Sequence, residues 1–120
     1  MWSQKSNFCD IPTDCPTRER AGWTGDMGVF IETGLTLMDC YPVVEKWLAE
    51  CRLNQYPDGR MANIAPPNAR PGYMTPMLCM SAGWGDAAIL VPYALYKRTG
   101  DRKILADNYE MMQRWYGFFA

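Results

Sequence analysis

Gly22-Trp23-Thr24-Gly25-Asp26 and Gly83-Trp84-Gly85-Asp86 are two copies of one short pattern, about sixty residues apart. Each copy introduces a mainly apolar run, from about Asp26 to Leu37 and from about Asp86 to Lys97. A helix that is apolar on most sides is buried nearly all round. We therefore predict two inner helices, each introduced by a turn that carries a tryptophan and an aspartate.

Two further segments predict outer helices, because their apolar residues follow the helical period on one face only. One runs from about Pro42 to Leu53, and the other starts at about Leu105, with a short turn and a restart near Asp107. Inner and outer helices in alternation are typical of αα-hairpins that stack with further copies. The predicted fold class is all-α, with two αα-hairpins forming a sector of an α/α toroid. The outer helices carry apolar faces of Val44, Trp47, Leu48 and Cys51, and of Met112, Trp115, Tyr116 and Phe119.

Several residues predict where the helices end. Asp39 suits the N-cap of the first outer helix. Gly100 suits a C-cap and Asp101 the next N-cap. Pro92 predicts a kink or local break in the second inner helix.

The chain is predicted to be one partial domain over residues 1–120. Between the hairpins lies a long proline-containing stretch, and loops of this length are usually functional or disordered. Its apolar residues favour an ordered loop that covers another part of the protein. Trp2 and Phe8 lie close to the first residue and would need to be buried, as expected for a sequence that begins in the middle of a domain. The predicted parts are a substrate-site loop (1–25), a first hairpin (26–54), the long ordered loop (55–85) and a second hairpin (86–120).

Composition excludes several classes of function. An apolar fraction of 48% argues against disorder, and a net charge of −1 without a basic stripe argues against a nucleic-acid partner. The apolar runs are too short to span a membrane. The N-terminus lacks a signal-peptide pattern, and the compartment stays open between cytoplasm and periplasm.

The five cysteines have no C-x-x-C spacing, and the chain has no histidine. A zinc site, a Cys–His nucleophile and a Ser-His-Asp triad are therefore not expected, nor is any metal or cofactor. The thiols are predicted to be free and mostly buried, as in a reducing compartment.

The thirteen residues from Asp14 to Asp26 hold three carboxylates, two guanidiniums and one indole. Carboxylates beside a flat aromatic are suited to hold a sugar and protonate a glycosidic oxygen. Glu19 is the candidate general acid, with its pKa raised by Asp14 and Asp26. At least one neighbouring arginine, Arg18 or Arg20, would then point at sugar hydroxyls or at Asp14. The alternative is a solvated surface ion pair.

Trp23 and Trp84 suit stacking on a sugar ring, or else anchoring of the hairpins. Their equal place in the repeat puts both at the same end of the toroid. Asp26 and Asp86 are candidate site acids, or else caps of the inner helices.

The segments Asp14–Asp26 and Ser81–Ala87 resemble the catalytic domain of the bacterial α-L-rhamnosidases, family 78 of the glycoside hydrolases. Trp47-Leu48, Pro57–Arg60 and Tyr96–Asp101 follow in the family's order, so the resemblance covers essentially the whole chain. It implies an (α/α)6 barrel that removes terminal α-L-rhamnose from glycosides or polysaccharides with inversion. It also implies that Glu19 is the general acid, that Asp14, Arg18 and Asp26 hold rhamnose hydroxyls, and that Trp23 and Trp84 line the sugar pocket.

The resemblance also places the family's general base, a glutamate, and a sugar-binding histidine beyond Ala120. Inversion needs a second carboxylate roughly 6.5–9.5 Å from the acid. Asp14 and Asp26 belong to the acid's own loop, so the 120 residues alone are expected to be inactive. Two alternatives stay open: a non-catalytic carbohydrate-binding module that self-assembles into a homo-oligomer through its exposed inner helices, and an α/α-barrel glycosidase for another sugar.

Overall fold

A computed structural model of the chain describes residues 1–67 and 81–120. Regular structure in these ranges is helical, beside two isolated β-bridges, Phe8–Pro12 and Trp23–Ile64. The all-α prediction is thus confirmed. The helices are α1 (Trp2–Asn7), α2 (Thr24–Leu37), α3 (Tyr41–Leu53), α4 (Ala82–Gly85), α5 (Ala87–Thr99) and α6 (Arg102–Phe119).

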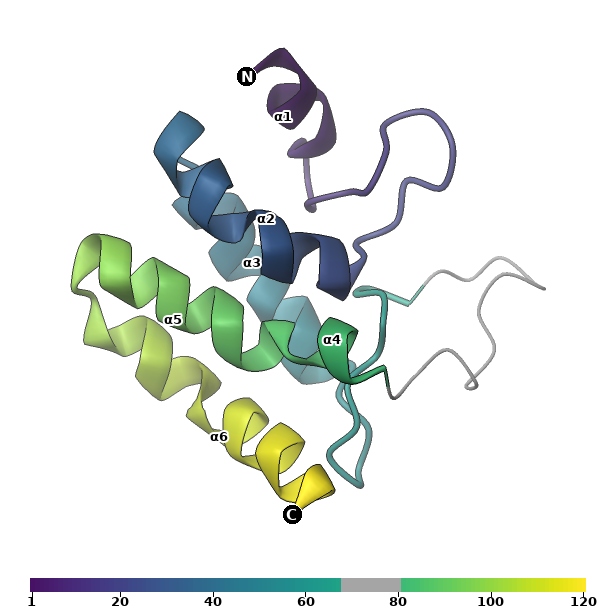
Figure 1. Cartoon of the computed structure of the whole chain (residues 1–120), viewed down its shortest axis with the longest axis vertical. Coiled ribbons are helices and arrows are strands. Elements are labelled where there is room, and N and C mark those ends of the chain that lie inside the picture. The colour runs from purple at the N-terminus through teal and green to yellow at the C-terminus, as the bar shows by residue number, and fades with distance from the viewer. Residues whose placement is uncertain (68–80) are drawn as a thin grey trace.

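The two inner helices, α2 and α5, lie side by side, with α3 and α6 as the outer helices (Figure 1). Gly28 of α2 lies beside Ala87 at the start of α5, where a Cβ on the glycine would be 3.6 Å from the Ala87 Cβ, in ordinary van der Waals contact. The N-terminal ends of α2 and α5 lie on the same side of the molecule, next to the loops and α4 (Figure 1). The core between the helices is built from apolar side chains that include Met27, Ile31, Val44, Leu48, Val91 and Leu95.

The inner helices are covered on one side only. Val29 of α2 is 88% exposed, and Leu90 and Tyr93 of α5 are exposed as well. The sequence predicted both helices to be apolar on most sides, and two hairpins do not provide enough surface to bury them. This incomplete burial is what a sector of a larger toroid requires.

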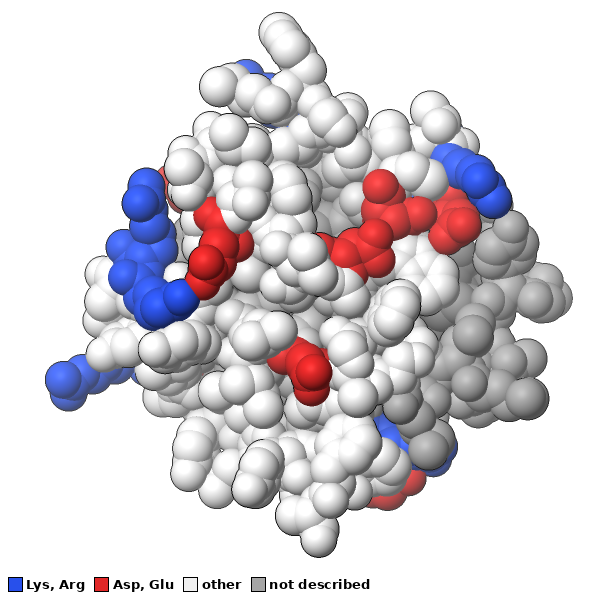
Figure 2. Space-filling model, in the orientation of Figure 1, with Lys and Arg blue, Asp and Glu red and all other residues white. Residues whose placement is uncertain are grey.

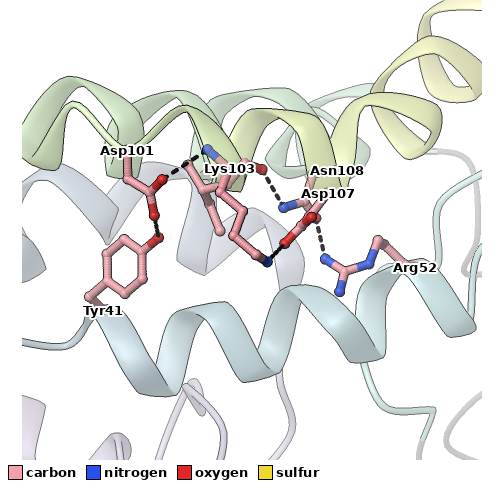
Figure 3. A network of polar contacts seen from close by, with 7 residues as sticks. Tyr41, Arg52, Asp101, Lys103, Asp107 and Asn108 are labelled. Carbon is pink, nitrogen blue, oxygen red and sulfur yellow. Dashed lines mark hydrogen bonds and ion pairs between the residues drawn. The ribbon is translucent and has the colours of Figure 1, made fainter.

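Polar contacts join the outer helices α3 and α6 (Figure 3). The Tyr41 hydroxyl donates to Asp101 over 2.9 Å, and Arg52 donates to the Asn108 side chain over 2.7 Å. Burial, with the Asp101 carboxylate beside the hydroxyl, raises the pKa of Tyr41 to about 12. These contacts fix the register of the two outer helices relative to each other.

The predicted helix ends agree with the structure at two of three positions. Gly100 ends α5 with a positive φ of 72°, and the Asp101 side chain accepts the Lys103 N–H over 2.8 Å. The prediction for Asp39 is one residue off, because Cys40 is the N-cap of α3. The Asp39 carboxylate still accepts the Tyr41 N–H over 3.2 Å, so it performs the chemistry of a cap from one residue earlier.

The predicted turn and restart near Asp107 are wrong, and the local break predicted at Pro92 as the alternative to a kink does not occur. Helix α6 continues through Asp107, because Asn108 is buried and satisfied by Ile104 and Arg52. Helix α5 continues through Pro92, where packing of α5 against α2 and α6 holds it in place despite the missing N–H.

The buried face of α6 also differs from the predicted one. Trp115 is buried as predicted, whereas Tyr116 and Phe119 are exposed. The sequence pattern placed the face about one residue too far along, because it ignored the buried polar Asn108. The buried residues are Ile104, Asn108, Met111 and Trp115.

Two short helices lie inside segments predicted as loops. Helix α1 falls within residues 1–25 and α4 within 55–85; both are too short to give a periodic signal. Phe8 is buried as expected, but Trp2 is 85% exposed. The ordered loop predicted over 55–85 includes residues 68–80, which lie outside the described residues.

The thiols fit their prediction only in part. Cys40 and Cys51 are buried, Cys9 is exposed and Cys15 is half-buried, while Cys79 lies outside the described residues. All four described thiols are free. Burial raises the pKa of the Cys51 thiol, which keeps it protonated and inert.

Candidate functional site

A cavity of about 720 Å³ opens between α1, α4 and α2, which lines it from its first turn to Leu37. Four of the six residues predicted for the site line it: Asp14, Trp23, Asp26 and Trp84. Trp23 and Trp84 come from the two copies of the repeat, and the structure brings them to one cavity as their equal places in the repeat predicted. A cavity of this size can hold a sugar together with part of the group attached to it.

The loop before α2 closes on itself through Asp14. Its backbone N–H donates to the Ala21 carbonyl, and its side chain accepts the Ala21 N–H, both over 3.1 Å. Arg20 makes this return in the left-handed region, with φ of 54°, which is uncommon for a residue other than glycine. Such a conformation persists where surrounding contacts hold it, often at a binding site.

Glu19 is joined to the cavity wall by Trp23. The Trp23 indole N–H donates to Glu19 Oε2 over 2.8 Å, and the Glu19 backbone N–H donates to the Cys15 sulfur over 3.3 Å. An indole N–H only donates, so it holds a carboxyl oxygen that does not carry a proton. The contact therefore fixes Oε2 of Glu19 at the indole.

Three carboxylates are close enough to influence one another. Burial raises the pKa of Asp26, and the charges of Asp14 and Glu19 raise it further. Figure 2 shows acidic side chains gathered over the N-terminal end of α2 and the loop before it. Asp26 lies in the first turn of α2 and not at its N-cap, which is Trp23. Asp26 also lines the cavity, so its position is compatible with both predicted roles, a site acid and a carboxylate at the start of the helix.

Trp84 lies flat against the start of α2. A Cβ on Gly25 would come within 2.8 Å of the Trp84 ring, so the glycine allows this close approach. Trp84 remains 40% exposed and forms part of the cavity wall. The Trp84 indole and Asp26 thus line the same cavity beside the first turn of α2.

Arg18 and Glu19 are the two predicted site residues that do not line the cavity. Arg18 is exposed on the loop, and Glu19 reaches the cavity only through its bond to Trp23.

The part of the chain that the structure describes holds no group of His, Cys, Asp or Glu side chains able to bind a metal ion. Within the same ranges, no helix is long and apolar enough to cross a membrane.

Asp86 takes neither of the two roles that the sequence suggested for it, a site acid or a cap of α5. Its side chain makes no capping bond to α5 and instead accepts the Trp115 indole N–H over 3.1 Å. Asp86 therefore ties α6 to the start of α5. The pattern could not reveal this contact, because Trp115 lies 29 positions along the chain.

Sequence analysis missed the apolar side of the cavity. Phe8 and Phe30 form an edge-to-face pair with centroids 6.0 Å apart, and both line the cavity. The short helix α1, which positions Phe8, had no periodic pattern to predict it. The apolar wall thus depends on a segment that only the three-dimensional structure identifies.

The fold and the site define a class: an α/α-hairpin protein whose inner helices begin at an acidic cavity walled by two indoles. Within that class the family is clear. Residues 1–119 match the model of the bacterial alpha-L-rhamnosidase six-hairpin glycosidase domain, and the chain belongs to this family. The predicted sector of an α/α barrel is thereby confirmed.

Individual relatives agree with this assignment. An alpha-L-rhamnosidase of Formosa agariphila is 41% identical over 96% of this chain. The crystal structure of Streptomyces avermitilis alpha-L-rhamnosidase complexed with L-rhamnose matches 95% of the chain with 42% identity and a TM-score of 0.85. Alpha-L-rhamnosidase from Dictyoglumus thermophilum matches 98% with 31% identity and a TM-score of 0.84. The chain spans 12%, 11% and 13% of these three relatives, respectively.

Proposed function

We propose that these residues form the acid-bearing part of an α-L-rhamnosidase active site, within a polypeptide as long as the relatives. The substrate is a terminal α-L-rhamnose on a glycoside or polysaccharide. The observation that carries the proposal is the 2.8 Å bond from Trp23 to Glu19, at the wall of a cavity that also contains Asp14, Asp26 and Trp84. The rhamnose-bound structure of the Streptomyces avermitilis relative supports the choice of sugar.

In this proposal Glu19 protonates the glycosidic oxygen as the bond to the leaving group breaks. Trp23 holds Oε2, and the acid proton is assigned to Oε1. Asp14 and Asp26 accept hydrogen bonds from sugar hydroxyls. Arg18, directly before Glu19 in this chain, is proposed from the resemblance to contact sugar hydroxyls.

The two indoles bind the apolar parts of the sugar. Trp23 and Trp84 offer flat faces to a ring that carries a methyl group in place of one hydroxymethyl. The apolar pair Phe8 and Phe30 lies farther along the same cavity, where the attached group would extend.

Hydrolysis with inversion also needs a base that activates water on the opposite face of the sugar. Asp14 and Asp26 line the same cavity as Trp23, whose indole N–H donates to Glu19. Both aspartates are proposed to bind sugar hydroxyls, so neither is assigned the role of base. We therefore propose that the base comes from outside these residues, so the isolated 120-residue chain is expected not to turn over an aryl α-L-rhamnoside. Turnover by the purified chain that Glu19→Gln abolishes would contradict this.

Glu19→Gln in the full-length protein is the direct test of the acid. General acid catalysis contributes about 10²–10⁴-fold, so kcat on a rhamnoside with a poor leaving group should fall by that factor. A strongly activated aryl leaving group needs less protonation and should retain most of its rate. Anomeric NMR of the first product should show inversion, and equal losses on both substrates would argue against Glu19 as the acid.

Exposed apolar side chains favour one further candidate property, self-association. Val29, Leu90 and Tyr93 on the inner helices offer a surface that a second copy would cover. Light scattering of the isolated chain should then show a defined oligomer, whereas a monodisperse monomer would rule this out.

A further inference from the structure

Trp47, on the outer helix α3, is fully buried, and its polar atom is bonded to a buried residue outside the helix. Its indole N–H donates to the Ala65 carbonyl over 2.8 Å. The Ala65 N–H in turn donates to the Gly22 carbonyl over 3.0 Å. A Cβ on Gly22 would lie 2.9 Å from the Trp47 indole nitrogen and 2.2 Å from the Ala65 oxygen. The outer helix thus contacts the residue directly before Trp23.

Trp115, on the outer helix α6, makes the corresponding contact in the second hairpin. It is also buried, and its indole N–H donates to Asp86 over 3.1 Å. A Cβ on Gly85 would lie 2.2 Å from the Trp115 ring. Gly85 directly follows Trp84, so this outer helix likewise reaches the turn that carries a site indole.

Both hairpins therefore use the same device. An outer-helix tryptophan packs on a glycine next to a site tryptophan. Its N–H donates to the turn that begins the inner helix, as at Asp86, or to Ala65, which itself donates to Gly22 in that turn. We propose that Trp47 and Trp115 are positioning residues, which fix Trp23 and Trp84 at the cavity wall. This inference rests on the proposed function, because it assigns both indoles to the sugar site.

The two positioning residues act on different parts of the site. Trp47 acts through Ala65 and Gly22 on Trp23, whose indole holds Glu19, so it controls the placement of the acid proton. Trp115 acts through Gly85 and Asp86 on Trp84, which contacts the sugar and not Glu19. Loss of Trp47 should therefore affect proton donation, and loss of Trp115 should affect sugar binding.

Packing alone does not explain the pair. A phenylalanine would fill most of either space, but it would leave the Ala65 carbonyl or the Asp86 carboxylate without the indole donor. A structural role would lower the amount of folded protein and reduce kcat equally on every substrate. If Trp47 is a positioning residue, its substitution lowers kcat by a factor that depends on the leaving group. If Trp115 is one, its substitution raises KM.

The test compares Trp47→Phe and Trp115→Phe in the full-length protein, on aryl α-L-rhamnosides with a poor and an activated leaving group. A displacement of about 1 Å lowers the rate by about 100-fold, which is the loss expected in kcat for Trp47→Phe on the poor leaving group. The loss on the activated substrate should be much smaller. Trp115→Phe should raise KM for both substrates by a similar factor. Losses in kcat that are equal on both substrates for both variants would overturn the proposal.

A second pair of variants changes the same two contacts from the glycine side. Gly22→Ala and Gly85→Ala insert one methyl group at the two contacts without opening a cavity, and should reproduce the kcat and KM effects, respectively. Gly117→Ala on α6 is the matched control, since its Cβ would meet nothing within 4 Å. Wild-type kinetics for Gly22→Ala and Gly85→Ala would also overturn the proposal.

A readout without activity separates this inference from the proposed function. In protein labelled with 5-fluorotryptophan, the ¹⁹F resonance of Trp23, assigned through Trp23→Phe, should shift in both Glu19→Gln and Trp47→Phe. It should stay in place in Trp115→Phe. An unmoved Trp23 resonance in Trp47→Phe contradicts positioning even if rhamnosides are hydrolysed. A full-length protein inactive on every rhamnoside contradicts the function even if the resonance moves.

Discussion

The turns at Gly22–Asp26 and Gly83–Asp86 have nearly the same sequence and different chemistry. In the first, Trp23 is the N-cap of α2 and binds Glu19, while Asp26 carries a raised pKa at the cavity. In the second, Trp84 lies inside the short helix α4, and Asp86 binds the core residue Trp115. The tryptophan and aspartate of the first turn thus lie beside the candidate acid, whereas the aspartate of the second turn binds the outer helix.

The difference comes from what lies near each turn. Glu19 is four residues before Trp23 and meets its indole N–H across the loop. In the second turn the nearby partner is the Trp115 indole of α6, which requires an acceptor because it is buried. A repeated sequence therefore predicts repeated backbone positions, but each side chain's role depends on its neighbours.

The largest expected effect separates the two indoles. Trp23→Phe in the full-length protein removes the donor to Glu19, and kcat on a rhamnoside with a poor leaving group should fall by about 100-fold. Trp84→Phe keeps an aromatic wall and should mainly raise KM, since an aromatic contact is worth about 1 kcal/mol. Steady-state kinetics of both variants check this, and equal falls in kcat would remove the distinction between the turns.

The second effect separates the two aspartates by stability. Asp86→Ala leaves the buried Trp115 indole N–H without an acceptor and should lower the free energy of unfolding by about 1–3 kcal/mol. Asp86→Asn keeps an acceptor oxygen and should lower it less, while Asp26→Ala should not lower it. Urea unfolding measures all three, and an unchanged midpoint for Asp86→Ala would show that the bond to Trp115 adds nothing.

The smallest effect concerns pH. Because folding raises the pKa of Asp26, the folded state binds its proton more tightly than the unfolded state. The resulting stabilisation is present below the ordinary aspartate pKa of about 4 and is lost as pH rises through the raised value. Asp26→Asn carries no charge and should be more stable than the unsubstituted protein at pH 7, with the gain vanishing in acid.

Thermal unfolding of the Asn variant at neutral and acidic pH checks this sign. Loss of activity should accompany the gain in stability, because the carboxylate is proposed to bind a sugar hydroxyl. A variant that is less stable at neutral pH would mean that the Asp26 charge stabilises the fold.

Much of the fold followed from local patterns. The apolar runs after the two turns predicted both inner helices, and Gly100 and Asp101 predicted the boundary between α5 and α6. The predictions failed where a distant partner decided the outcome. A turn was predicted near Asp107, but the next residue, Asn108, is buried against Arg52 and the helix continues. Helix α1 is held by contacts such as the bond from Gln4 to the Gly34 carbonyl.

For the site, sequence patterns indicated the residue types and tertiary contacts decided their arrangement. The cavity brings together Asp14, Trp23, Asp26 and Trp84, while Arg18 stays outside it. No pattern indicated that Trp47 would bind Ala65 beside Gly22. The roles of Glu19, Arg18 and the other candidates in catalysis and binding stay predictions until the variants are measured.

The sequence by itself determined the order of inner and outer helices, the end at which the indoles lie and the supply of acids in one loop. Helical periodicity, caps and turns act over a few residues, so a local pattern suffices for them. Only the tertiary structure decided that Trp23 holds Glu19, that Asp86 serves Trp115 and that α1 closes the cavity. Such contacts depend on how helices and loops pack, and packing brings together side chains whose separation along the chain carries no periodic signal.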